Sequence, residues 1–264
     1  MEYKKNIYTV EDGIATITMN YPDNLNAIDM DMAEELLDIL DKCENDPSVK
    51  VVILKSGGKA FSAGGDIGYF YKNIKAGGDI NMDDLIERAG YVSLNIKKMS
   101  KIVITSVIGA AAGAGANLAL SGDFVVCADN VKFIQAFINL GLVPDTGGTY
   151  LLSKSIGIAK AFGLCATGKP LGAVEAMELG IVNKVCSKDE LEETTMALAK
   201  KITEGPLIAY KNLKKQFFEA NYTDYEKYLK DGEVPTQREC IASEDFKEGV
   251  CAFIEKRKAD FKGE

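Results

Sequence analysis

The chain has 264 residues, of which 47% are apolar, and a formal net charge of −8. This length is enough for a sizeable core, and the negative charge argues against binding to a phosphate backbone, so we expect no nucleic-acid partner. No apolar run approaches the roughly 20 residues that cross a bilayer, and the start lacks the apolar region of a signal peptide. A cytoplasmic protein with no membrane partner is therefore predicted.

The chain contains no histidine. This excludes Ser-His-Asp and Cys-His mechanisms, histidine general-base catalysis and most zinc sites. The six cysteines contain no C-x-x-C pair and are predicted to be reduced packing residues, so no metal site is expected. Acid or base chemistry must come from Asp, Glu, Lys, Tyr or Cys.

The first part of the chain predicts a hairpin, a helix and a buried strand. Polar and apolar residues alternate over 6–10 and 13–19, on either side of a Glu-Asp-Gly turn. After a loop at 21–27, apolar residues at helical spacing predict a helix from Asp29 that ends before Pro47. The apolar run 50–55 predicts a buried strand.

A glycine-rich loop at 56–67 follows this strand and leads toward a helix, where backbone N–H groups are free to bind negative charge. Alone, the loop is more typical of an ordinary strand-to-helix turn. Residues 71–84 are predicted to be an exposed, mobile insertion, and 82–99 a helix. A strand at 102–107 and a second small-residue loop at 108–116 follow, which predicts a layered α/β fold with a parallel sheet. Two successive crossovers would then bring two sets of backbone donors together.

Asp145 is a single carboxylate within the apolar segment 137–149. Burial among apolar residues raises the proton affinity of a carboxylate toward the range that proton transfer needs. The alternative is that Asp145 caps a helix that starts at Thr146. The two glycine loops upstream favour the catalytic interpretation.

Four stretches together resemble the crotonase (enoyl-CoA hydratase/isomerase) superfamily, in order along the whole chain: 58–67, 107–116, 141–149 and 248–257. Within it, 113–118 and 143–148 are similar to the ring-1,2-epoxyphenylacetyl-CoA isomerase branch. The resemblance implies an α/β fold built as a spiral of ββα turns over 1–197, followed by a C-terminal helical trimerisation region over 198–264. Amphipathic helical patterns at 191–202, 207–220, 222–229 and 243–258 agree with this, although 222–233 is also typical of a solvated face.

The resemblance also implies site residues. The backbone N–H groups of Gly65 and Ala114 correspond to the pair that holds a thioester oxygen, and Asp145 to an acid used by some isomerases of the family. The two positions where hydratases carry glutamates are Asn117 and Phe137 here, and neither can act as a general base.

Coenzyme A contacts are implied mostly for backbone groups, and for one lysine of the last helix: Leu25, Ala27, Ala63, Gly64, Asp66, Ile67 and Lys256. Asp66 is expected to cap the following helix. Lys256 also fits a solvated surface, as is usual in a run of charges. No resident cofactor is expected, because coenzyme A enters as part of the substrate.

The expected activity is an acyl-CoA isomerase that converts 3-enoyl-CoA to 2-enoyl-CoA, or isomerises a ring epoxide. Two alternatives stay open: an enoyl-CoA hydratase with another base, and a non-catalytic subunit that binds acyl-CoA. The expected partners are an acyl-CoA thioester and further copies of the chain, as a homotrimer or a dimer of trimers.

Overall fold

A computed structural model of the chain describes residues 3–78 and 80–264. Within these residues the main sheet has six strands in the order β1-β2-β3-β4-β6-β9. β1 and β2 are antiparallel, and every other neighbouring pair is parallel. The strands are β1 (Asn6–Glu11), β2 (Ile14–Met19), β3 (Val51–Ser56), β4 (Ile102–Val107), β6 (Phe124–Ala128) and β9 (Lys184–Cys186).

The predicted hairpin is confirmed. β1 and β2 pair from Asn6 opposite Met19 to Glu11 opposite Ile14. The turn between them uses left-handed backbone at Asp12 and Gly13, with φ of 51° and 81°, as short hairpin turns require.

A second sheet of three short strands lies beyond the carboxyl ends of the main strands, in the order β5-β7-β8: β5 (Ala110–Ala112), β7 (Lys132–Ile134) and β8 (Leu171–Gly172). β4 continues into β5, and β6 into β7. Isolated bridges between Ile28 and Gly65 and between Ser62 and Ala111 extend the same pattern to the chain that follows β2 and β3. Each turn therefore adds one strand to each layer, which is the predicted spiral.

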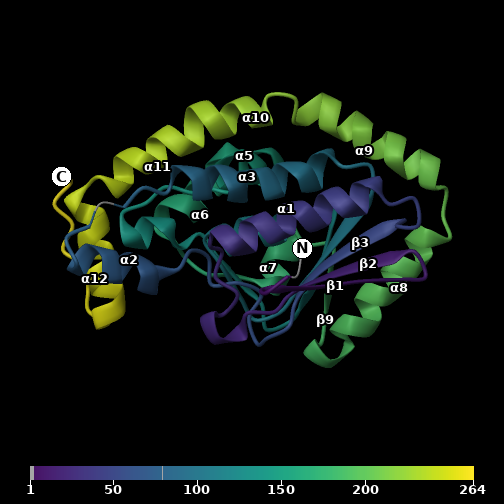
Figure 1. Cartoon of the computed structure of the whole chain (residues 1–264), viewed down its shortest axis with the longest axis horizontal. Helices are drawn as coiled ribbons and strands as arrows, with labels where there is room; N and C mark the ends of the chain where they lie inside the picture. The colour runs from purple at the N-terminus through teal and green to yellow at the C-terminus, as the bar shows by residue number, and fades with distance from the viewer. Residues whose placement is uncertain (1–2, 79) are drawn as a thin grey trace.

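Helices cover the sheets and extend beyond them, with α1 and α3 packed side by side (Figure 1). Those up to the last strand are α1 (Met30–Asn45), α2 (Ile67–Lys75), α3 (Asp83–Lys98), α4 (Ala114–Leu120), α5 (Gly148–Ile156), α6 (Ile158–Thr167) and α7 (Ala173–Glu178). Short 3-10 turns are η1 (Pro22–Asn24), η2 (Ala136–Leu140) and η3 (Lys188–Glu190).

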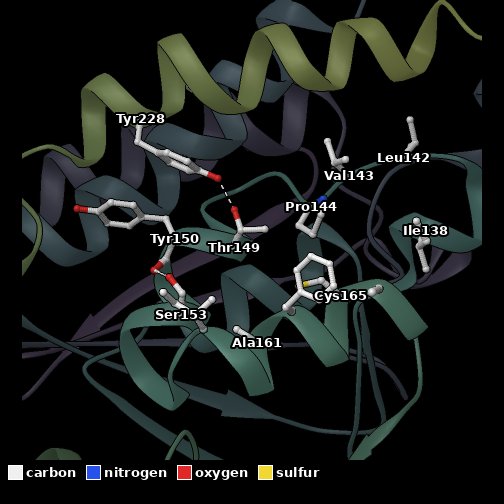
Figure 2. A pocket seen from close by; sticks show the side chains of 13 residues that line it. Ile138, Leu142, Val143, Pro144, Thr149, Tyr150, Ser153, Ala161, Cys165 and Tyr228 are labelled. Atoms are coloured by element: carbon white, nitrogen blue, oxygen red, sulfur yellow. Dashed lines mark hydrogen bonds between the residues drawn. The ribbon is translucent and has the colours of Figure 1, made fainter.

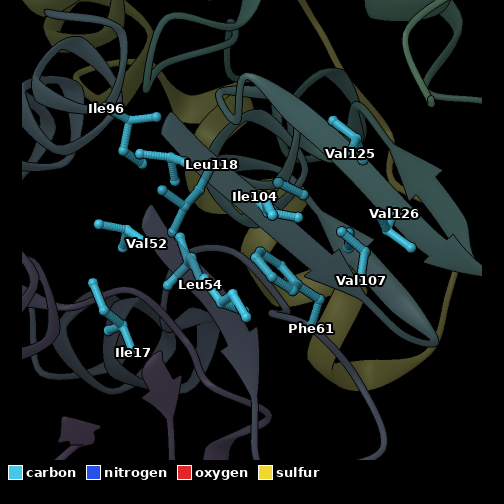
Figure 3. Close-up of a cluster of buried hydrophobic side chains, with 14 of the residues drawn as sticks. Ile17, Val52, Leu54, Phe61, Ile96, Ile104, Val107, Leu118, Val125 and Val126 are labelled. Carbon is cyan, nitrogen blue, oxygen red and sulfur yellow. The ribbon is translucent and has the colours of Figure 1, made fainter. Parts of the chain in front are cut away.

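The core lies between the main sheet and these helices. Its strands carry β-branched and other apolar side chains on both faces, because a parallel sheet is covered on both sides. Figure 3 shows side chains of β3, β4 and β6 in contact with those from the loop at Phe61 and from α3 and α4.

The C-terminal part is helical after β9, as predicted: α8 (Leu191–Thr203), α9 (Leu207–Asn221), α10 (Tyr225–Tyr228), a π-helical turn η4 (Leu229–Glu233), α11 (Val234–Ile241) and α12 (Glu244–Glu255). From α9 to α11 the chain runs over α3, and α12 packs against α2 (Figure 1). α8 continues across residue 197, so the division into 1–197 and 198–264 stays a prediction. Among the described residues, none of the helices combines the length and the apolar character that a membrane span requires.

Two sequence-based expectations need correction. Residues 71–75 are not part of an irregular insertion but complete α2, because Phe70 is buried against Phe246 of α12 and so fixes the helix. The helix α11 was not anticipated, because its apolar periodicity is weak and it follows a charged stretch.

Ser62 joins three loops near the centre of the fold. Its side chain is fully buried, donates a hydrogen bond to the carbonyl of Asn26 at 2.7 Å and accepts one from the N–H of Gly64 at 3.2 Å. The hydroxyl therefore satisfies two buried backbone groups at once.

Replacing this hydroxyl tests its contribution. Ser62→Ala is expected to lower the free energy of unfolding by about 1–3 kcal/mol, because two buried polar groups lose their partner. Urea unfolding followed by circular dichroism measures this. The exposed variant Thr223→Ala serves as control and is expected to change stability by about 0.5 kcal/mol or less. Equal stability of both variants would contradict the role of Ser62.

Candidate active site

The two glycine loops lie in direct contact. Gly64 has a φ of 87°, and a Cβ atom there would lie 2.7 Å from the carbonyl oxygen of Ala112. Gly113 also has left-handed backbone, with a φ of 51°, and lies against Gly64. Only glycine permits this approach without strain. The close contact brings the chain after β3 beside the chain after β5.

Backbone hydrogen bonds fix this contact. The N–H of Phe61 donates to Ala110 at 2.9 Å, and the N–H of Ala112 donates to Ser62 at 3.0 Å. Gly65 and Ala114 directly follow these paired segments. Among the hydrogen bonds of the described residues, neither the Gly65 N–H nor the Ala114 N–H donates to a protein acceptor. Two uncommitted backbone donors on adjacent loops are the kind of group that stabilises a developing oxyanion.

Asp145 lies in the segment between η2 and α5, and its side chain is buried. Its carboxylate accepts hydrogen bonds from the Thr146 hydroxyl at 2.9 Å and from Nε2 of Gln237 at 3.2 Å. Its backbone carbonyl accepts one from Nδ2 of Asn117, on the first turn of α4, at 2.7 Å. Asn117 therefore ties Asp145 to the helix that begins at Ala114.

The helix-cap interpretation of Asp145 is wrong. The N-cap of α5 is Gly147, and no side chain makes the capping hydrogen bond. Burial raises the pKa of the Asp145 carboxyl to about 6, against the hydrogen bonds from Thr146 and Gln237, which lower it. The direction agrees with the expectation from its apolar neighbours. Asp145 is thus a carboxylate that exchanges a proton near neutral pH.

The backbone next to Asp145 is strained. Thr146 has a φ of 54°, which is rare for a β-branched residue, and Gly147 follows with a φ of 80°. A Cβ atom on Gly147 would lie 1.6 Å from the Tyr225 hydroxyl oxygen, so glycine is required there. Strain of this kind concentrates at functional sites and persists because the surroundings hold it.

Two polar side chains at this site were missed by sequence reasoning, Glu233 and Gln237. Both are buried, at 2% and 0% exposure. The interpretation of 222–233 as a solvated face is therefore wrong at Glu233, which packs against Gly147. The separation of Glu233 and Gln237 by four residues places them on one side of a helix, and that spacing was the available signal. They lie opposite Gly147 and Asp145 respectively.

An apolar cavity of about 530 Å³ lies next to the segment that carries Asp145 (Figure 2). Leu142, Val143 and Pro144 form one wall, α5 and α6 form another, and the ring of Tyr228 covers it. The Tyr228 hydroxyl is hydrogen bonded to Thr149 (Figure 2). The lining does not include Asp145, Gly65 or Ala114.

Comparison with known proteins identifies the family of this chain. The family model for enoyl-CoA hydratase/isomerase matches residues 9–264. The chain belongs to the enoyl-CoA hydratase/isomerase family.

Named relatives in this family are isomerases and hydratases. The chain is 36% identical to a trans-2-decenoyl-[acyl-carrier-protein] isomerase of Streptococcus mutans, over all of both chains. It is 37% identical to the 1,2-epoxyphenylacetyl-CoA isomerase of Escherichia coli, over 96% of this chain and 97% of the relative. An enoyl-CoA hydratase structure from Mycobacterium avium subsp. paratuberculosis superposes with a TM-score of 0.90 at 29% identity, over 99% and 100% of the chains. The predicted crotonase superfamily is therefore confirmed, and named isomerases of two types are among its relatives.

Most of the coenzyme A residues expected from the enoyl-CoA hydratase/isomerase family lie together. The Ala63 N–H donates to Leu25 at 2.9 Å, and the Ile28 N–H donates to Gly64 at 2.7 Å, so 25–28 runs beside 63–65. Ala27 is buried in this contact. Asp66 caps α2 through the Tyr69 N–H at 2.9 Å, as expected, and Ile67 begins that helix.

Lys256 is separated from these residues within one chain. It is not in the last helix but follows it, as the C-cap of α12 with a φ of 54°. The neighbouring Glu255 lies 3.6 Å from Lys75, at the far end of α2 from Asp66. A shared contact with one coenzyme A therefore stays a prediction.

Asn117 and Phe137, the two positions at which the resemblance implies glutamates in hydratases, carry side chains without acid or base function. Asn117 is buried, and its Oδ1 accepts a hydrogen bond from Gln135 at 2.7 Å. Phe137 packs its ring against Gly113. The backbone carbonyl of Asp145 accepts the hydrogen bond from Asn117 and so ties residue 145 to the first turn of α4.

The raised pKa of Asp145 predicts a stability effect. Below pH 3.8, the ordinary pKa of an aspartate, the Asp145 carboxyl is protonated in both the folded and the unfolded chain and its burial carries no charge. Above about pH 6 the carboxyl is charged in both states, and the cost of burying this charge lowers the free energy of unfolding by its full amount. Asp145→Asn is expected to gain stability relative to the natural chain as pH rises through this range, by up to roughly 3 kcal/mol. Urea unfolding between about pH 4.5 and pH 8 measures the trend. The exposed variant Asp189→Asn is the control, and parallel curves for all three proteins would contradict the assignment.

Proposed function

We propose that this protein is an enoyl-thioester isomerase that moves a double bond from the 3,4 to the 2,3 position of an acyl-CoA. The observation that carries the proposal is Asp145: a buried carboxylate with a pKa of about 6, oriented by two hydrogen bonds and tied to the helix that begins at Ala114. Named relatives that are isomerases support it.

The proposed reaction needs one base and two donors. The Asp145 carboxylate takes a proton from C2, and the C2–H electron pair forms a C1–C2 double bond while the thioester oxygen becomes negative. The N–H groups of Gly65 and Ala114 donate to this oxygen. The protonated Asp145 then returns the proton to C4: the C3–C4 π pair forms the new C4–H bond, the C1–C2 π pair moves to C2–C3, and the thioester carbonyl re-forms. No water is consumed, in keeping with Asn117 and Phe137 where hydratases carry glutamates.

The same groups serve the isomerisation of a ring epoxide next to a thioester, the reaction class named for one relative. The carrier named for another relative is an acyl carrier protein, so the assay includes both carriers. Coenzyme A enters as part of the substrate, without a resident cofactor, and the proposed location is the cytoplasm.

Incubation with the 3-enoyl and 2-enoyl thioesters of coenzyme A, and separately of acyl carrier protein, in deuterated water tests the reaction. Interconversion with deuterium at C4 supports the isomerase. Formation of 3-hydroxyacyl-CoA favours a hydratase that uses another base. Binding without any conversion favours a non-catalytic acyl-CoA subunit.

Removal of the proposed base gives the sharpest test. Asp145→Asn is expected to lower kcat by at least ~100-fold and to leave the affinity for the CoA ester nearly unchanged, because only proton transfer is lost. Stopped-flow absorbance and calorimetric titration measure these two quantities. Asp189→Asn is again the control. Retained turnover in Asp145→Asn would reject the mechanism.

We further propose assembly into a homotrimer or a dimer of trimers. Large apolar side chains are strongly exposed on α6 and α9, including Phe162 at 73% and Ile208 at 80%. Exposed apolar groups on several helices are typical of an interaction surface.

A charge on this surface is expected to break the assembly. The natural chain is expected to have a solution mass of three or six times its 28.6 kDa, and Phe162→Glu a lower multiple. Light scattering after size exclusion measures the mass, with the exposed variant Lys188→Glu as control. An unchanged mass in Phe162→Glu would remove α6 from the interface.

A further inference from the structure

Glu233 is a buried carboxyl that the proposed reaction does not use. It ends the π-helical turn η4 and is 2% exposed. Its Oε2 accepts a hydrogen bond from the Gly147 N–H at 3.1 Å, while its Oε1 has no hydrogen-bond partner among the described residues. Burial of a carboxyl oxygen without a hydrogen-bond partner lowers the stability of the fold. A group that is kept at this cost is a candidate for a functional role.

Glu233 and Gln237 together hold both ends of one short segment. Oε1 of Gln237 accepts a hydrogen bond from the Val143 N–H at 3.1 Å, and Glu233 accepts from Gly147. Asp145 is the middle residue of this segment, and Gln237 also donates to its carboxylate. The π-helical turn is immediately followed by α11, so both side chains emerge toward the segment on consecutive turns.

We propose that Glu233 is a positioning residue for Asp145: through the Gly147 N–H it holds the strained turn at Thr146 and Gly147, and so fixes the direction of the Asp145 carboxylate. The proposal rests on the proposed role of Asp145 as the base. It explains how Thr146, which is not a glycine, keeps a φ of 54°. A rare backbone conformation of this kind persists only where the surrounding residues hold it in place.

Glu233 does this in its uncharged form. The ionisable groups that interact with it in the described part of the chain are Asp145 before α5 and Tyr225 and Tyr228 of α10, and none of them is a cation. Burial, and then the charge of Asp145, raise the pKa of Glu233 well above its ordinary value. A neutral Glu233 keeps the acceptor for the Gly147 N–H and adds no second negative charge beside Asp145.

Two substitutions separate the parts of this role. Glu233→Gln keeps a neutral group with an oxygen acceptor for Gly147, whereas Glu233→Ala removes the acceptor. We expect Glu233→Ala to lower kcat ~10- to 100-fold with KM changed less than about twofold, because a displaced base slows the chemical step more than binding. Glu233→Gln is expected to stay within about threefold of the natural kcat. The exposed variant Glu219→Gln is the matched control.

The pH profile gives a readout that a purely structural role would not move. The acid limb of kcat is expected near the Asp145 pKa of about 6 in both the natural enzyme and Glu233→Gln. If Glu233 were charged at this pH, its removal would shift the limb downward, and the charge assignment would be overturned. A kcat of Glu233→Gln as low as that of Glu233→Ala would overturn positioning in favour of a role for the carboxyl itself.

Asp145→Asn distinguishes this proposal from the one it rests on. If that variant is inactive and folded Glu233→Ala keeps full kcat, only the positioning role fails. If Asp145→Asn is active, the proposed reaction itself fails. Thermal unfolding shows whether Glu233→Ala is folded. If it is not, the kcat and the acid limb of Glu233→Gln test the positioning role without it.

Discussion

The site depends on the contact between Gly64 and the Ala112–Gly113 backbone. Because no side chain separates these loops, the Gly65 and Ala114 amides follow two neighbouring, hydrogen-bonded segments. The spiral order of the strands produces this contact, since successive main strands each continue into the second layer. The close approach of the two loops, and with it the neighbouring position of the two amides, depends on the absence of Cβ atoms where two crossovers meet.

The pKa of Asp145 is set by the burial of its side chain. Its carboxylate is removed from water without a cation to pair with, so its pKa rises to about 6. Two neutral donors, Thr146 and Gln237, orient it while offsetting only part of the burial. A lysine or arginine in their place would lower the pKa and give a weaker base. Neutral donors therefore suit a group that must both accept and release a proton.

Local pattern was enough to predict much of this structure. The hairpin, α1, β3, α3 and β4 follow from periodicity and turn residues, and the two glycine loops mark where backbone donors meet. Glu233 and Gln237 did not emerge, because charge patterning alone cannot show that a helix is covered on its polar side. Likewise, the burial of Phe70 against Phe246 depends on a contact between segments far apart in sequence.

The position of η4 and α11 has a consequence for biosynthesis. Residue 145 and both amide donors are translated long before residues 233 and 237, which complete the hydrogen bonds around it. A nascent chain that ends before residue 233 carries Asp145 with its Thr146 partner but lacks Glu233 and Gln237. The remaining hydrogen bonds of the 143–147 segment can therefore form only once the closing helices have been made and have docked.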